Sequence, residues 1–476
     1  MATVAEAMWG SFLRFGAVIA AWLALASGAQ AGGPGLVIGA TEDAVRSTTL
    51  VDAKAQMDLL ALAGFRAVRI TQIWAPGERA VSPDDVATLE NVVAAAKLSN
   101  VTVLTSVMNF GSRTTPLTDA DQSDFAAYAA NVLEQVPELH TLIIGNEPNL
   151  NRYWLPQFNV DGTDAAAPAY EALLARTYDA VKTVAPDVTV LGGAVSPRGG
   201  DDPNSTRLTH SPTVFIQDMG QALRDSGRTA PIMDGFAFHP YEDNSSVAPM
   251  DGTHPYSTTI ALADYDKLVG LLGAAFGDYT LPIWYDEFGV ESQIPVEKQS
   301  FYINQEVPAT KPVDEATQAA YYTQAIQLAF CQPNVHGLFL FHAFDERDMT
   351  GWQSGLYYAD ETPKASLDAV RQAMDESRRG VIAHCDALPL AVHPRVVRRG
   401  AVLTLTCDLD CAYVAQLYRL PGRLLVAKHG RAVGGKPNTL PLRVPKTKGS
   451  YRLRLSAVAA VNPGPAATLR LNVRHG

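Results

Sequence analysis

The sequence predicts an α/β fold, a (β/α)8 TIM barrel followed by a small all-β sandwich domain. Three observations support this prediction. Eight short apolar runs alternate with helical patterns over about 345 residues, which suits a barrel with enlarged loops. Past Cys385 short strand patterns replace the helical ones. The balance of charge also changes there. With 476 residues, 47% of them apolar, the chain is long enough for two or three domains, each with its own core.

The eight runs are short, continuous and rich in Val, Ile, Leu and Phe, as expected for parallel strands buried on both faces. They are Gly35–Ala40, Ala67–Ile73, Val101–Met108, Thr141–Gly145, Val188–Ala194, Met233–Phe238, Ile283–Tyr285 and Gly337–Phe341.

Helix punctuation separates these runs. Ser82-Pro83 and Ser211-Pro212 each place an N-cap residue before a proline suited to the first helical position. Thr118 is a further candidate cap. Helices are expected at Asp84–Ser99, Asp119–Gln135, Ala165–Val184, Glu315–Ala329 and Lys364–Ser377. The alternative, a doubly wound open sheet, usually carries a glycine-rich phosphate turn, and neither GxGxxG nor GxxxxGK[ST] occurs.

The C-terminal part differs in pattern and in charge. Strands are expected at Ala401–Thr406, Tyr413–Leu420, Leu424–Lys428, Tyr451–Val458 and Ala467–Val473. From Ala383 onward there are 15 basic and 3 acidic residues, a balance of +12, whereas the preceding residues carry 23 basic and 46 acidic residues, a balance of −23. The sequence therefore predicts a barrel over residues 32–382 and a β-sandwich over residues 386–476.

The first 31 residues resemble a secretory signal peptide. Arg14 precedes the apolar run Phe15–Ala26, and Ala29-Gln30-Ala31 fits the small-x-small cleavage rule. The run is too short to span a bilayer comfortably, so we expect a secreted protein without stable membrane insertion. Export permits disulfides. The spacing of Cys407 and Cys411 suits a local disulfide, which would leave Cys331 and Cys385 to pair.

Two carboxylates follow predicted strands. Asn146-Glu147-Pro148-Asn149 follows the fourth run, and Asp286-Glu287 follows the seventh. In a TIM barrel the active site lies at the carboxyl ends of the strands. A single glutamate there would most simply be a solvated loop residue, but two of them predict a catalytic pair.

The stretch Ile143–Asn149 (IIGNEPN) is similar to the acid/base motif of clan A glycoside hydrolases, the cellulase-like 4/7 superfamily that includes families 5 and 39. The resemblance covers roughly residues 35–375. It implies that Glu147 is the general acid/base, that Glu287 is the nucleophile and that the anomeric configuration is retained. Retention requires two carboxyl groups about 5–5.5 Å apart.

Four further residues fit supporting roles in this resemblance. Arg69 in VRIT would orient the nucleophile and keep it ionised. Asn146 would bond the sugar 2-hydroxyl. His239 and Tyr241 in FAFHPY are similar to the family's H-x-Y, in which the tyrosine hydroxyl touches the nucleophile.

Two positions depart from the family pattern. Family 5 members usually have a histidine near the end of strand three, where Asn109 is the nearest polar candidate here. Strand eight usually ends in a tryptophan that forms the floor under the sugar, but this chain has His342 there. Trp352, ten residues later, could replace it from the loop. Tyr153, Trp154 and Trp284 are further candidates for stacking on sugar.

The sequence therefore predicts a secreted retaining glycosidase that acts on a carbohydrate substrate. No metal or other cofactor and no nucleic-acid partner is expected. A transglycosidase of the same fold and a non-catalytic carbohydrate-binding barrel are the alternatives, although binding alone needs no pair of glutamates. The C-terminal domain could simply cap the barrel, which is the role we favour, or it could contact cell-wall or other anionic polysaccharides through its basic residues.

Overall fold

The computed structural model describes residues 32–380, 391–393, 402–406, 411–433, 437–443, 447, 449–459 and 467–473. The predicted signal peptide and the junction between the two predicted domains lie outside these residues, so both stay predictions. Neither Cys331 nor Cys411 is a free thiol. Their predicted partners Cys385 and Cys407 lie outside the described residues, and the pairing also stays a prediction.

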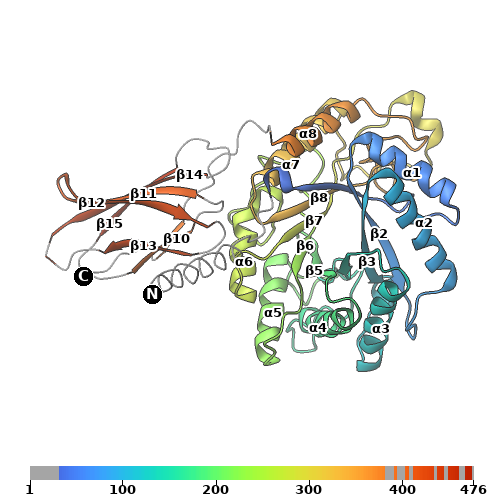
Figure 1. The fold of residues 1–476 in the computed structure, drawn as a ribbon, viewed down its shortest axis with the longest axis horizontal. Coiled ribbons are helices and arrows are strands. Elements are labelled where there is room, and N and C mark those ends of the chain that lie inside the picture. The colour runs from blue at the N-terminus through green and yellow to red at the C-terminus, as the bar shows by residue number, and fades with distance from the viewer. Residues whose placement is uncertain are drawn as a thin grey trace, which may run out of the picture. The chain divides into compact units, whose positions relative to one another are not determined.

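Eight parallel strands form a closed barrel in the order of the chain, as the sequence predicts (Figure 1). Each strand pairs with the next from β1 through β8, and β8 pairs back with β1; the register shifts between β5 and β6 and between β7 and β8. The strands are β1 (Val37–Thr41), β2 (Ala67–Trp74), β3 (Thr102–Asn109), β4 (Thr141–Ile144), β5 (Thr189–Val195), β6 (Gly235–Phe238), β7 (Ile283–Phe288) and β8 (Val335–Phe341).

The helices surround the strands (Figure 1). They are α1 (Leu50–Ala63), α2 (Pro83–Ser99), α3 (Asp119–Gln135), α4 (Ala166–Val184), α5 (Pro212–Asp225), α6 (Tyr265–Phe276), α7 (Glu315–Phe330) and α8 (Leu367–Arg379). The side chains of Ser82, Thr118 and Ser211 cap α2, α3 and α5 as predicted. Short 3-10 helices, η1 (Gly33–Gly35), η2 (Ser112–Thr114), η3 (Leu262–Asp264) and η4 (Val296–Phe301), lie before β1 and in the loops.

Helices α1 and α6 were not predicted. The apolar residues of α1 are spread around the helix, so no single stripe marks its buried face. Helix α6 contains Gly270 and Gly273, and glycine is a poor helix former. Tertiary packing explains both helices, because Met57 and Leu60 of α1 and Leu268 and Leu272 of α6 belong to the main hydrophobic cluster.

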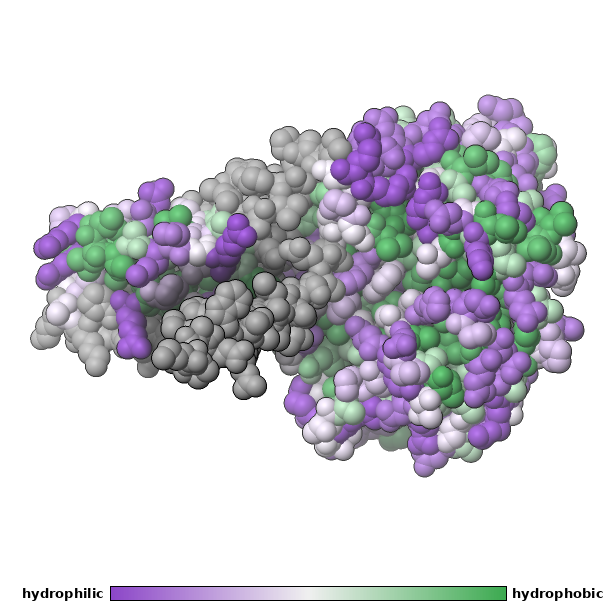
Figure 2. Space-filling model, in the orientation of Figure 1, coloured by the Kyte–Doolittle hydropathy of each residue, from purple (hydrophilic) through white to green (hydrophobic). Residues whose placement is uncertain are grey.

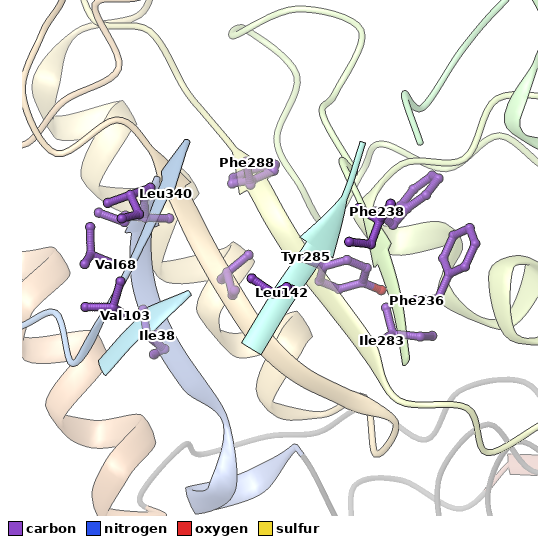
Figure 3. Packing of buried hydrophobic residues seen from close by; sticks show 14 of the residues in the cluster. Ile38, Val68, Val103, Leu142, Phe236, Phe238, Ile283, Tyr285, Phe288 and Leu340 are labelled. Atoms are coloured by element: carbon purple, nitrogen blue, oxygen red, sulfur yellow. The ribbon is translucent and has the colours of Figure 1, made fainter. Parts of the chain in front are cut away.

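The period of two in the strands divides the barrel into an outer and an inner layer. Val68 and Ile70 of β2 pack outward against the helices, in the cluster that Figure 3 shows in part. Ala67 lies in a separate inner cluster with Leu104 and Phe339. The same alternation directs Arg69 into the barrel interior, where a cation requires negative partners.

The C-terminal residues form two antiparallel sheets (Figure 1). One sheet has the order β13-β10-β9 and the other β12-β11-β14-β15. Leu403 and Leu440 of the first sheet share a hydrophobic cluster with Tyr413 and Leu453 of the second, so the prediction of an all-β domain with two packed layers is confirmed. The strands are β9 (Ala391–His393), β10 (Val402–Thr406), β11 (Cys411–Arg419), β12 (Arg423–Ala432), β13 (Asn438–Arg443), β14 (Tyr451–Ala459) and β15 (Ala467–Val473).

Two strands of this domain, β9 and β13, were not predicted. Strand β9 has only three residues, and β13 contains Pro441, which lowers the strand signal.

Polar and apolar residues are interspersed on the face of the barrel seen in Figure 2. Within the described part of the chain, no helix is both long and apolar enough to cross a membrane.

Candidate active site

Glu147 follows β4 in an unusual backbone conformation. Gly145 has a φ of 83° and Glu147 a φ of 41°, a left-handed value that is uncommon for a residue with a side chain. The backbone N–H of Glu147 donates to the carbonyl of Ala194 over 2.8 Å. Ala194 is the extra residue where the pairing of β5 with β6 shifts register. A bulge in β5 therefore fixes the glutamate, as bulges beside active sites often do.

Tyr170 of α4 stabilises the turn that follows β4. Its hydroxyl donates to the carbonyl of Ile144 over 2.6 Å and accepts from the N–H of Gly193 over 2.7 Å. A side chain at position 145 would meet the Tyr170 ring at 3.0 Å, so glycine suits both the space and the positive φ. One buried tyrosine thus ties the end of β4 to β5.

Asp286 and Glu287 lie at a second irregularity. Tyr285 pairs with Leu338 and Phe288 pairs with Leu340, so three steps along β7 match two along β8. This extra residue breaks the alternation of sides. Asp286 and Glu287, although adjacent in sequence, both reach the same group of side chains on the inner side of the barrel.

His239, directly after β6, lies at the centre of this group. Its Nδ1 lies 3.1 Å from Glu147 Oε1 and 3.4 Å from Glu287 Oε2. Its Nε2 lies 3.4 Å from Asp286 Oδ1. The imidazole is fully buried, and three carboxylates surround it. The two glutamate oxygens cannot lie farther apart than about 6.5 Å, the sum of their distances to Nδ1.

Arg69 holds the opposite side of Glu287. Its guanidinium donates to Glu287 Oε1, and its Nε lies 3.4 Å from Asp286 Oδ2. A second nitrogen donates to Asn146 Oδ1 over 3.2 Å and to Ser106 Oγ over 3.3 Å. Arg69 thus links the nucleophile candidate to the asparagine that precedes Glu147.

These charges set the ionisation of the group. Burial by itself would raise the pKa of Glu287, but the charges of His239 and Arg69 and the hydrogen bonds from Arg69 and Tyr241 outweigh it and hold the pKa below its usual value. Burial would lower the pKa of His239, yet Glu287 and Asp286 raise it to about 10. Near neutral pH, Glu287 is therefore an anion and His239 a cation.

Tyr241 and Trp352 line a cleft beside Glu147. The Tyr241 hydroxyl donates to Glu287 Oε2 over 3.0 Å, and its ring lies 4.9 Å from the Trp352 ring at an angle of 33°. Glu147, Tyr241 and Trp352 border an open cleft of about 290 Å³. Its other lining residues are Ser196, Pro197, Arg198, Glu242, Asp243, Asn244, Ser245, Gly289, Glu291, Ala309 and Thr310.

Asn109 and His342 have other partners. The Asn109 amide donates to the carbonyls of Gly111 and Tyr153, so it fixes the backbone of two loops. The His342 Nδ1 donates to the carbonyl of Thr41 over 2.7 Å, and Nε2 lies 3.3 Å from Glu346. The polar contacts of both side chains are therefore with these groups and not with Glu147 or Glu287.

Asp286, to which the sequence assigned no role, contacts both cations of the site and is fully buried. Its place directly before Glu287 was the available signal. Burial raises the pKa of the Tyr153 phenol most, and the nearby charges of Glu147 and Glu287 raise it further.

Two candidate sugar-stacking residues lie elsewhere. Trp154 is buried, with its ring 5.8 Å from that of Tyr170. Trp284 packs inside the barrel, 6.2 Å from Phe339. Both rings serve the packing of the barrel.

Among the described residues, no group of three or more His, Cys, Asp and Glu side chains is arranged to hold a metal ion. The chemistry that the group of Arg69, His239, Glu147, Asp286 and Glu287 can perform is proton transfer and nucleophilic attack by carboxylates.

No protein-family model matches the sequence, and no curated protein matches it. Solved structures do. A family 39 glycoside hydrolase from the gut symbiont Bacteroides cellulosilyticus WH2 is 18% identical, with a TM-score of 0.52 over 85% of this chain and 80% of that chain. A family 5, subfamily 18 glycoside hydrolase from Streptomyces cattleya, in complex with Manβ1-4GlcNAc, is 17% identical, with a TM-score of 0.52 over 77% of this chain and 86% of that chain.

These similar structures belong to the clan A families that the motifs predict. The predicted resemblance is therefore confirmed at the level of the fold.

Proposed function

We propose that this protein is a retaining glycoside hydrolase in which Glu147 is the general acid/base and Glu287 the nucleophile. The observation that carries the proposal is the contact of one atom, His239 Nδ1, with both glutamates. It limits the separation of the facing oxygens to about 6.5 Å. Retaining enzymes have carboxyl groups about 5–5.5 Å apart, whereas inverting enzymes leave about 6.5–9.5 Å for a water molecule.

The first step needs an anion that attacks the anomeric carbon and an acid that protonates the leaving oxygen. An oxygen of Glu287 bonds to the anomeric carbon while the bond to the leaving oxygen breaks, and the proton of Glu147 passes to that oxygen. The lowered pKa of Glu287 supports its role as the anion.

In the second step Glu147 acts as a base. It takes a proton from water, the water oxygen bonds to the anomeric carbon, and the bond to Glu287 breaks. The Tyr241 hydroxyl and Arg69 stabilise the carboxylate that leaves.

The walls of the cleft suit a sugar. Tyr241 and Trp352 offer aromatic surface beside Glu147, against which the C–H face of a sugar ring can pack. Asn146, whose carbonyl oxygen accepts from Arg69, keeps its amide nitrogen for the 2-hydroxyl. The family names of the similar structures agree with a carbohydrate substrate, and we propose β-glycosidic linkages. We also propose that the first 31 residues direct export of the protein.

Glu147→Ala tests the assignment, because the two steps need this residue differently. General acid/base assistance is typically worth about 10²–10⁴-fold. We expect the variant to lose most activity on glycosides with poor leaving groups. On a dinitrophenyl β-glycoside, kcat/KM should stay near the wild-type value while kcat falls. Azide should then restore turnover and give a β-glycosyl azide, since azide needs no general base.

Glu138→Ala is the matched control, because Glu138 is an exposed glutamate in the loop before β4. It should retain wild-type kinetics on both substrates. Equal losses of kcat/KM on both substrate types in Glu147→Ala, without azide rescue, would contradict the acid/base assignment. A carbohydrate-binding barrel without catalysis would release no phenol from any aryl glycoside. A transglycosidase would transfer the sugar to an added glycoside acceptor faster than to water.

A further inference from the structure

A second hollow lies outside the active site, between α4 and α5. It has a volume of about 810 Å³, and five carboxylates line it. They are Asp164, Glu171, Asp201, Asp218 and Asp225. None of these residues borders the cleft beside Glu147.

The sequence places these acids together through helical spacing. Asp218 and Asp225 are seven residues apart on α5, so they share one face of that helix. Glu171 lies on α4, and Asp164 and Asp201 lie in the loops that precede the two helices. Five carboxylates from two helices and two loops thus surround one space.

This space has little positive charge to balance it. Within the described ranges, the ion pairs of these carboxylates involve only His210, whose Nε2 lies 3.3 Å from Asp164 and whose Nδ1 lies 3.9 Å from Asp201. Arg228 acts on Glu171 only from a distance, because Asp179 binds its guanidinium. At pH 7 the hollow therefore carries a net negative charge, although burial raises the pKa of Asp164, Glu171 and Asp218.

Buried polar atoms at the hollow have no hydrogen-bond partner in the structure. They are Asp164 Oδ2, Glu171 Oε1 and His210 Nδ1. The side chains of Asp164 and His210 are only 4% and 2% exposed, and Glu171 as a residue is 5% exposed. Burying such an atom without a partner costs about 1–3 kcal/mol. Asp218 lies within hydrogen-bonding reach of Asp164, and the two carboxyls can pair only while one of them is protonated.

An organic cation fits this space better than a metal ion does. The acids line a large volume rather than converging on one point, and no group of three among the described residues suits a metal. The volume is in the range of pockets for small organic ligands, about 300–1,000 Å³. Phe158, whose ring lies 4.2 Å from that of His210, adds an aromatic surface, which attracts cations.

We propose that the hollow between α4 and α5 binds an organic cation that carries primary ammonium groups, through Asp164, Glu171 and Asp218. Each ammonium group supplies three donors, and Asp164 Oδ2 and Glu171 Oε1 lack a donor in the structure. Polyamines and oligosaccharides of glucosamine share this chemistry. The site is independent of the proposed hydrolysis, so its test needs no substrate turnover.

Isothermal titration calorimetry of the full chain at pH 7 and low salt tests the proposal, with spermidine and tetra-glucosamine as ligands. Their N-acetylated forms serve as neutral controls. We expect saturable binding of at least one amine and none of its acetylated form. Asp218→Asn and Glu171→Gln should each weaken the affinity about tenfold or more, since each removes a charged hydrogen-bond partner. Asp187→Asn, an exposed aspartate before β5, is the matched control and should bind as the wild type does.

Circular dichroism and melting temperature check that each variant is folded. Because the two variants lie on different helices, the test still works if one of them fails to fold. The proposal fails if neither amine binds, if both folded variants bind as tightly as the wild type, or if the acetylated ligands bind equally well. Calcium chloride binding that Asp218→Asn abolishes would show an inorganic cation site and overturn the assignment.

Discussion

His239→Asn removes the cation that lies between the catalytic candidates while keeping a side chain that can donate a hydrogen bond. The imidazolium lies 3.4 Å from Glu287. At an effective dielectric constant of about 20, two unit charges at this distance interact by about 5 kcal/mol. One pKa unit corresponds to about 1.4 kcal/mol, so the charge of His239 can lower the pKa of Glu287 by about 3.5 at most.

Arg69 still faces Glu287 in the variant, and an opposite charge typically shifts a carboxyl pKa by about 1–3 units. The pKa of Glu287 is lowered in the wild type, with His239 as the strongest lowering influence. Loss of that cation raises this pKa. The nucleophile then ionises at higher pH, and the acidic limb of kcat/KM should move upward by about 1–3 pH units.

The assay is the pH dependence of kcat/KM on the best aryl β-glycoside substrate. His336→Asn is the matched control. His336 lies near the start of β8, beside Trp284, whereas the active site lies at the carboxyl ends of the strands. The control variant should leave the acidic limb in place. If folded His239→Asn kept the wild-type limb, or if both variants shifted it equally, the electrostatic role of His239 would be refuted.

Two further predictions concern single contacts. Tyr241→Phe removes the hydroxyl that donates to Glu287 Oε2. A hydrogen bond to a charged group is worth about 1.5–3 kcal/mol, so kcat/KM on the same substrate should fall about tenfold to a hundredfold. A loss below about threefold would contradict the role of this hydroxyl. Lys364→Met breaks the buried pair with Asp345, 2.7 Å long, and should lower the free energy of unfolding in urea by about 3–5 kcal/mol. Arg371→Met, which breaks an exposed pair with Asp368, should cost about 1 kcal/mol or less, and equal effects of the two variants would count against the burial argument.

The strands and the glutamate pair could be predicted because their signals are local. A parallel strand buried on both faces reads as a continuous apolar run, and a polar residue at its end stands out. Glu147 and Glu287 follow such runs, and both reach His239 in the structure. Helix α3 begins at the predicted Asp119, because Thr118 and Asp121 form a capping box, and it also ends at the predicted Gln135.

The shape of the site could not be predicted, because it depends on register between strands that are distant in sequence. The bulge at Ala194 and the extra residue in β7 are properties of strand pairs, and no local pattern in either strand marks them. Asp286 was therefore left without a role, and the bonds from the Asn109 amide to loop carbonyls could not be foreseen. The hollow between α4 and α5 likewise combines residues from two helices and two loops.

The central claim is that Glu287 forms a covalent bond to the sugar. The most direct measurement uses the 2-deoxy-2-fluoro derivative of the best aryl β-glycoside substrate, followed by proteolysis and mass spectrometry. The account predicts time-dependent inactivation with one fluoroglycosyl group on the peptide that contains Glu287, and no labelling of Glu287→Gln. A label on any other residue, or unlabelled enzyme whose first-formed product has the inverted anomeric configuration, would contradict it.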